Sequence, residues 1–161
     1  MTKVLHVKIP VTDVQRSVTW YCDLMDLDLS KEFIEGDELR GAALMSPEGG
    51  FAFALRLRQY CAGQPDLTGF DVVALHMATR ESLEDLRRRC SELGARCTDI
   101  QDRASNEAVV DVSDPDGTLL RFYWVGPTDQ ADTFVGVTFN GQGPPSLVTE
   151  PRLSAPRVAG R

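Results

Sequence analysis

The chain has 161 residues, of which 42% are hydrophobic and 25% charged, and its formal net charge is −7. This composition is typical of a soluble globular protein, and the length suffices for one compact domain or two closely packed half-domains. The negative charge argues against binding to nucleic acid or to an anionic membrane surface. No apolar run approaches the roughly 18 residues that a membrane span requires.

The cysteines and the N-terminal segment indicate the compartment. The four cysteines form no CxxC pair, and the segment "MTKVLHVKIPV" contains no apolar core of secretory length. We therefore expect a cytoplasmic protein with reduced thiols. The arginine cluster at 87–89 is interleaved with acidic residues, which is typical of a solvated helix face rather than of an anion-binding patch.

The first part of the chain predicts a strand followed by a helix. Residues 4–11 alternate between apolar and polar side chains, which predicts a strand. A helix is expected to begin near Asp13, because apolar residues then recur at helical spacing: Val14, Val18, Tyr21, and Leu24 or Met25. The following segment reads as strands joined by a tight corner, "SPEGG", at residues 46–50.

About seventy residues later the same order returns. Residues 72–78 predict a strand, and a helical stripe ended by Gly94 follows, formed by Leu83, Leu86, Cys90 and Leu93. A second corner, "DPDGT" at residues 114–118, corresponds to "SPEGG" in the first copy. The repeat of strand, helix and hairpin in one order indicates a duplicated module.

The predicted fold is α+β, with two tandem βαβββ modules forming a curved mixed sheet around a cleft. We place the first module at residues 1–60, the second at 70–125 and a C-terminal extension at 126–161. Within the extension, residues 133–140 predict one more strand. The last ten or more residues are expected to be mobile or, alternatively, to form an arm that packs on a partner subunit.

The repeat resembles the vicinal oxygen chelate superfamily, which includes glyoxalase I, bleomycin-resistance proteins, extradiol dioxygenases and fosfomycin-resistance enzymes. The resemblance rests on "HVKIPVTDVQRSVTWYCDLMDLDL" in the first module and "DPDGTLLRFYW" in the second. It implies a ligand site between the modules, and pairing of modules either within one chain or across a dimer. We expect a homodimer.

The resemblance also bears on metal binding. In metal-using members each module supplies a His from its first strand and a carboxylate or Gln from its last. His6 and His76 occupy the first-strand positions, whereas the last-strand position of the second module holds Arg121. A guanidinium cannot ligate a cation, so a complete metal site is disfavoured. Two alternatives remain for Arg121, namely binding an anionic ligand or forming a salt bridge to Asp111.

The most favoured function is binding of a small polar or anionic organic molecule in the inter-module cleft, by sequestration or metal-independent acid–base chemistry. The alternative is a lyase, isomerase or dioxygenase that uses His6 and His76 to hold Fe, Mn, Ni or Zn. The candidate catalytic residues are His6, His76 and Tyr123. The candidate ligand-binding residues, assigned by strand alternation, are Lys8, Phe51, Phe53, Leu55 and Arg121.

Overall fold

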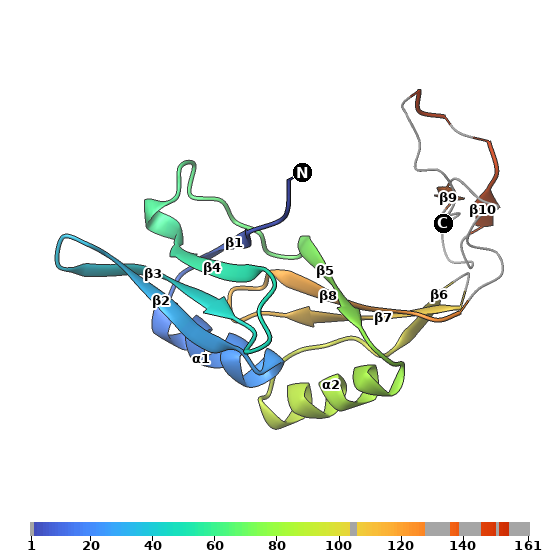
Figure 1. Ribbon diagram of the computed structural model, residues 1–161, viewed down its shortest axis with the longest axis horizontal. Coiled ribbons are helices and arrows are strands. Elements are labelled where there is room, and N and C mark those ends of the chain that lie inside the picture. Colours follow the sequence, from blue (N-terminus) through green and yellow to red (C-terminus); the bar gives the residue numbers. More distant parts are fainter. Residues whose placement is uncertain (1, 104–105, 128–135, 139–145, 151, 155–161) are drawn as a thin grey trace.

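The structure, a computed structural model, describes residues 2–103, 106–127, 136–138, 146–150 and 152–154. It contains two copies of a strand–helix–three-strand unit (Figure 1). The first module comprises β1 (His6–Val11), α1 (Val14–Met25), β2 (Asp28–Glu35), β3 (Glu38–Met45) and β4 (Ala52–Leu57). The second comprises β5 (Asp71–Met77), α2 (Glu81–Glu92), β6 (Gln101–Arg103), β7 (Glu107–Ser113) and β8 (Leu119–Val125).

Each module forms its own four-stranded mixed sheet. The strand orders are β1-β4-β3-β2 and β5-β8-β7-β6, so the two sheets are equivalent strand by strand. The first strand of each module pairs in parallel with the last, and the remaining pairs are antiparallel. Both helices lie on the same side of the two sheets, which leaves the opposite sheet faces without a covering helix (Figure 1). The α+β fold of two βαβββ units is therefore confirmed.

Local chemistry explains where the helices begin and end. Asp13 caps α1, since its carboxylate accepts the amide hydrogen of Arg16 at 2.9 Å. The hydroxyl of Thr79 does the same for Ser82 at the start of α2. Gly94, with φ at +62°, follows α2 in the left-handed region that favours glycine. The predicted start of the first helix near Asp13 and the predicted stop of the second at Gly94 are thus confirmed.

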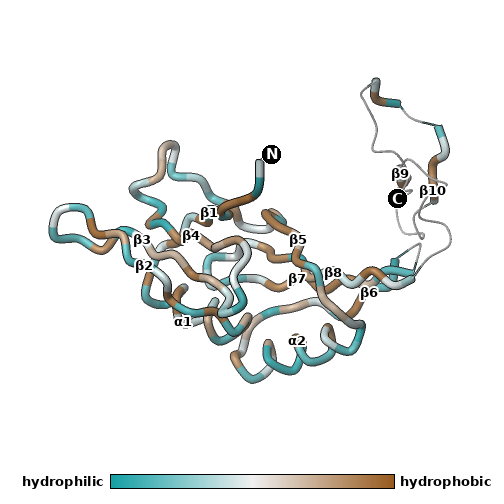
Figure 2. The backbone as a smooth tube through the Cα atoms, in the orientation of Figure 1, coloured by the Kyte–Doolittle hydropathy of each residue, from teal (hydrophilic) through white to brown (hydrophobic). Residues whose placement is uncertain are grey.

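The core lies between the helices and the sheets. Helix α1 buries Val14, Ser17, Tyr21 and Leu24. Helix α2 buries Leu83, Leu86 and Cys90 but is otherwise mostly hydrophilic (Figure 2). Leu93 was expected to continue this stripe, but it is 37% exposed because the helix ends at Glu92. None of the described helices combines the length and the apolar character needed to span a membrane.

The corner of the second module forms hydrogen bonds that link the two modules. Asp114 is 4% exposed, and it accepts a hydrogen bond from the hydroxyl of Tyr21 on α1 at 2.9 Å. Its neighbour Asp116 accepts the amide hydrogen of Thr12 at 3.0 Å and a hydrogen bond from Arg16 at 3.0 Å. The "DPDG" turn therefore packs against the beginning and the middle of the first helix.

Two short strands follow the second module. Strand β9 (Gly136–Thr138) falls within the predicted strand at residues 133–140, and it pairs with β10 (Ser146–Val148), which was not predicted. The other residues of that predicted strand, and most of the segment expected to be mobile, lie outside the described residues.

Candidate functional site

Strand pairing in the first module decides which side chains share a face. His6 and Lys8 on β1 are in register with Ala52 and Ala54 on β4, and side chains at paired positions point to the same side. The prediction that Phe51, Phe53 and Leu55 share the face of His6 is therefore wrong. Phe53 and Leu55 are 3% and 1% exposed and belong to the core, with the ring of Phe53 centred 5.6 Å from that of Tyr21.

A pocket of about 390 Å³ occupies the face of the first sheet opposite α1, and we call it the first-sheet pocket. Two of the chain's three lysines, Lys8 and Lys31, line it together with His6. Phe33, Met45 and small alanine side chains form its apolar part. No carboxylate is among its described lining residues, although the chain as a whole is acidic. The pocket therefore has a positive local charge.

The cations of this pocket differ in how they are paired. Arg56 also lines the pocket, but it bonds to Glu35, and this hydrogen bond lowers the pKa of the Glu35 carboxyl. Neither Lys8 nor Lys31 forms an ion pair with any described carboxylate. The two ammonium groups are thus free to contact an anionic ligand.

The second sheet presents a different surface on its uncovered face. Arg121 lies on the same face as His76 and Tyr123, as the alternation predicted. Its guanidinium binds both oxygens of Asp111, at 2.8 and 3.0 Å, and it also contacts Asp71 at 2.7 Å. The hydrogen bond with Asp111 raises the pKa of Arg121 further. The salt-bridge alternative is therefore confirmed, and the guanidinium is already matched by two carboxylates.

Tyr123 is similarly engaged. Its hydroxyl donates a 2.6 Å hydrogen bond to Glu107. Burial, reinforced by this hydrogen bond, raises the pKa of Tyr123 to about 12. The phenol therefore stays protonated near neutral pH and directs its proton toward Glu107, which makes it a poor general acid or base.

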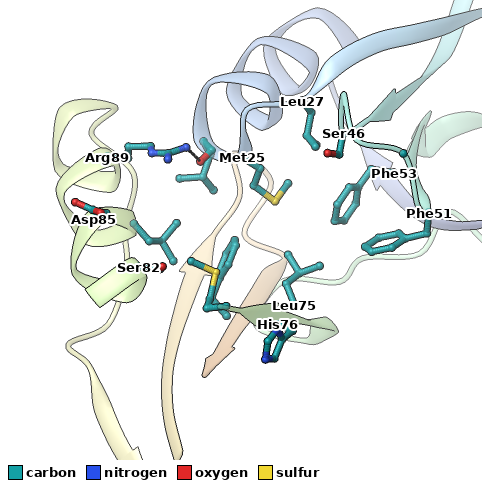
Figure 3. Close-up of a pocket in the computed structure, with 15 residues that line it drawn as sticks. Met25, Leu27, Ser46, Phe51, Phe53, Leu75, His76, Ser82, Asp85 and Arg89 are labelled. Atoms are coloured by element: carbon teal, nitrogen blue, oxygen red, sulfur yellow. Dashed lines mark hydrogen bonds between the residues drawn. The ribbon is translucent and has the colours of Figure 1, made fainter. Parts of the chain in front are cut away.

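A second pocket of about 450 Å³ lies between the modules on the side of the helices, and we call it the inter-module cavity. Figure 3 shows Met25, Leu27, Phe51 and Phe53 of the first module facing Leu75 on β5 across this space. The ring centroids of Phe51 and Phe53 are 5.4 Å apart. The polar residues that line it include Ser46, His76, Ser82, Asp85 and Arg89.

The structure thus distributes the predicted site residues over three places. His6 and Lys8 line the first-sheet pocket, which Leu55 also borders. Phe51, Phe53 and His76 line the inter-module cavity. Arg121 and Tyr123 lie on the uncovered face of the second sheet and line neither pocket. Neither of these two pockets brings all of the predicted site residues together.

The donor set does not fit the metal that the resemblance implies. His6 and His76 line different pockets. In the part of the chain that the structure describes, no three His, Cys, Asp or Glu side chains come together in a way that could hold an ion. Asp111, the nearest substitute acid in the sequence, is held by Arg121.

Two of the cysteines, Cys22 and Cys90, are poor nucleophiles. All four are free thiols. Burial raises the pKa of Cys90 to about 12 and also raises the pKa of Cys22. Because the thiolate is the reactive species, these two side chains act as small apolar residues in the helices.

The sequence did not lead to Lys31, Phe33 and Met45, because none of the predicted site residues came from the β2–β3 hairpin. It also missed Arg89, which was grouped with its neighbours on the solvated helix face. Lysine is rare in this chain, and its occurrence on two strands of the first module was a signal that could have identified Lys31.

A protein with two βαβββ units, each with its own four-stranded mixed sheet, belongs to the class of paired-module α+β proteins. The family model described as "Glyoxalase/Bleomycin resistance protein/Dioxygenase superfamily" matches residues 3–122, so the chain belongs to this superfamily. No curated protein sequence matches significantly.

Solved structures share the fold at low sequence identity. A superfamily member from Sphaerobacter thermophilus is 15% identical, with a TM-score of 0.66 over 77% of this chain and 98% of its own. TnmS3, an antibiotic binding protein from Streptomyces, is 16% identical, with a TM-score of 0.62 over 78% and 98%. The fosfomycin resistance protein FosX from Listeria monocytogenes is 11% identical, with a TM-score of 0.62 over 78% and 95%.

Proposed function

We propose that this protein binds a small organic anion with an apolar body in the first-sheet pocket. In this proposal the protein sequesters the molecule rather than transforming it, and no metal takes part. The observation that carries the proposal is the placement of Lys8 and Lys31 beside an apolar surface, with no carboxylate among the described lining residues. An anionic group would contact the two ammonium groups, and the apolar body would cover Phe33 and Met45. The pocket volume of about 390 Å³ is within the range of small-molecule sites.

Sequestration is favoured over catalysis because the pocket offers little acid–base chemistry. His6 is the one described lining side chain of a type that commonly serves as a general acid or base in catalysis. The other two candidate catalytic residues, His76 and Tyr123, do not line this pocket. The antibiotic binding protein TnmS3 shows that a protein of this fold can act by binding.

We further propose a homodimer in the cytoplasm. Its support is the exposure of large apolar side chains on the β2–β3 hairpin, where Leu29, Phe33 and Ile34 are 47%, 38% and 60% exposed. Apolar side chains clustered in this way on one hairpin favour a protein contact. Sedimentation equilibrium tests the dimer, and a monomer at all concentrations would contradict it. The free thiols of the four cysteines are compatible with a reducing compartment.

The natural methionines allow a direct test of the pocket. Met45 lines the first-sheet pocket, whereas Met25 and Met77 line the inter-module cavity. In protein labelled with ¹³C at the methionine methyl groups, phenyl phosphate should shift the Met45 signal in a saturable manner. The double variant K8Q/K31Q should weaken this binding at least about tenfold, because both charge-assisted contacts are lost.

The control is Lys3→Gln, which removes the third lysine outside both pockets and should leave the affinity unchanged. If K3Q weakens binding as much as the double variant, only the net charge matters and the pocket is not the site. A broad panel of organic anions that never shifts Met45 would also contradict the proposal.

A further inference from the structure

Arg89 is the exception within the arginine cluster of α2. Arg87 bonds to Asp99 at 2.6 Å, and Arg88 bonds to Glu92 at 2.8 Å, as expected for a solvated helix face. Arg89 instead donates to the backbone carbonyl of Leu24 at 3.1 Å, which crosses from the second module to the first. Within the described ranges, no carboxylate lies at ion-pair distance from its guanidinium.

Arg89, which has no described carboxylate partner, lines the inter-module cavity. Figure 3 shows Arg89 at one end of the space and the rings of Phe51 and Phe53 on the other side, with Met25 between them. Phe53 is 3% exposed and Phe51 is partly buried, so the cavity wall belongs to the packed interior rather than to the surface. The half-buried guanidinium meets the Leu24 carbonyl but no described carboxylate, so its charge is not neutralised by the residues that the structure describes.

We propose that the inter-module cavity is a second binding site, and that its ligand is a small aromatic monocarboxylate. The ring would lie against Phe51, Phe53 and Met25, where aromatic and thioether groups make favourable contacts. The carboxylate would accept hydrogen bonds from the N–H groups of Arg89 that do not contact Leu24. The volume of about 450 Å³ accommodates a two-ring molecule of this kind.

The charges around the cavity limit the ligand to a single negative charge. Asp85 lines the same cavity, and its partner Arg88 lies at 3.7 Å, so this carboxylate is only loosely neutralised. A dianion such as a phosphate monoester would be repelled by Asp85 more strongly than a monocarboxylate would. This site therefore differs from the first-sheet pocket in its face of the sheet, its residues and the charge of its ligand.

The methionine methyl signals separate the two sites in one experiment. In the full-length chain, naphthalene-2-carboxylate should shift Met25 and Met77 in a saturable manner, and the uncharged 2-naphthylmethanol should bind at least about tenfold more weakly. Arg89→Gln keeps an amide donor for the Leu24 carbonyl and should weaken carboxylate binding about tenfold. The matched control Arg87→Gln, two residues away on the same helix and bonded to Asp99 outside the cavity, should leave binding unchanged.

A second variant keeps the proposal testable if R89Q does not fold. Leu75→Phe adds volume inside the cavity and should abolish binding while Arg89 is intact. The proposal is overturned if Met25 and Met77 do not respond, if the alcohol binds as tightly as the carboxylate, or if R87Q weakens binding as much as R89Q. A response of Met45 alone would also overturn it and would place the ligand in the first-sheet pocket instead.

Discussion

The hydroxyl of Tyr21 donates a 2.9 Å hydrogen bond to Asp114, a residue 93 positions away in the other module. Both side chains are buried, and Asp114 also accepts the amide hydrogens of Asp116 and Thr118 at 2.9 and 2.8 Å. Three donors therefore meet one buried carboxylate at the contact between the modules. Burial also raises the pKa of Tyr21, so the phenol keeps the proton that it donates.

Removing this hydroxyl should weaken the whole fold. We expect Tyr21→Phe to lower the free energy of unfolding by about 1–3 kcal/mol, because the carboxylate loses a donor that buried surroundings cannot replace. Urea unfolding followed by circular dichroism measures the change. Tyr60→Phe is the matched control: it removes the same group from an exposed bond to Glu38 and should cost much less stability than Tyr21→Phe. Equal costs for the two variants would show that burial does not strengthen the contact.

The stability contribution of Asp114 should depend on pH. Burial raises the pKa of its carboxyl, against the opposing effect of the hydrogen bonds from Tyr21, Thr118 and Asp116. A raised folded-state pKa means that the contribution is fully present below the unfolded value of about 3.9 and is lost as the pH rises through the folded value. The unfolding free energy of the wild type minus that of Asp114→Asn should therefore fall from about pH 4 toward pH 7. A difference that increases with pH would show that the hydrogen bonds dominate.

We expect Arg121 to stabilise the fold rather than to bind the ligand. We expect Arg121→Met to lower the unfolding free energy by about 1–3 kcal/mol, because Asp111, whose side chain is 13% exposed, loses its bidentate partner. Asp71→Asn should cost less than about 1 kcal/mol, since that carboxylate is 39% exposed and screened by water. Phenyl phosphate should bind the R121M variant as it binds the wild type, measured at the Met45 methyl group. If a folded R121M variant no longer bound phenyl phosphate, Arg121 would instead be a ligand-binding residue.

Metal binding should be absent or independent of the histidines. We expect elemental analysis of protein purified without chelator to give far less than one equivalent of Fe, Mn, Ni or Zn, because the described residues bring no suitable ligand set together. The double variant H6A/H76A should contain the same amount as the wild type. A stoichiometric metal that disappears in the double variant would restore the alternative of a metal-dependent enzyme.

The fold was predictable because the signals for it are local and repeated. The cap at Asp13, the stop at Gly94 and the two proline-containing corners each follow from short-range chemistry. Their recurrence in one order at a spacing of about seventy residues then indicates the duplication.

The site was harder to predict because alternation along a strand gives two faces without saying which face the helix covers. The register of β1 with β4 places Ala52 and Ala54 beside His6 and Lys8. The large side chains Phe53 and Leu55 consequently belong to the buried face. Helix packing requires bulky residues on the covered face, and that rule, applied to β4, would have corrected the assignment.

The two corners of the repeat, which share Pro and Gly at matching positions, differ in what they contact. The second corner is bound to the first helix through Asp114 and Asp116, so substitutions there act on folding. The first corner carries Ser46 at the position of Asp114, and Ser46 and Gly49 line the inter-module cavity. Substitutions at residues 46–50 should therefore alter the lining of the inter-module cavity while leaving intact the hydrogen bonds that Asp114 and Asp116 form with the first module.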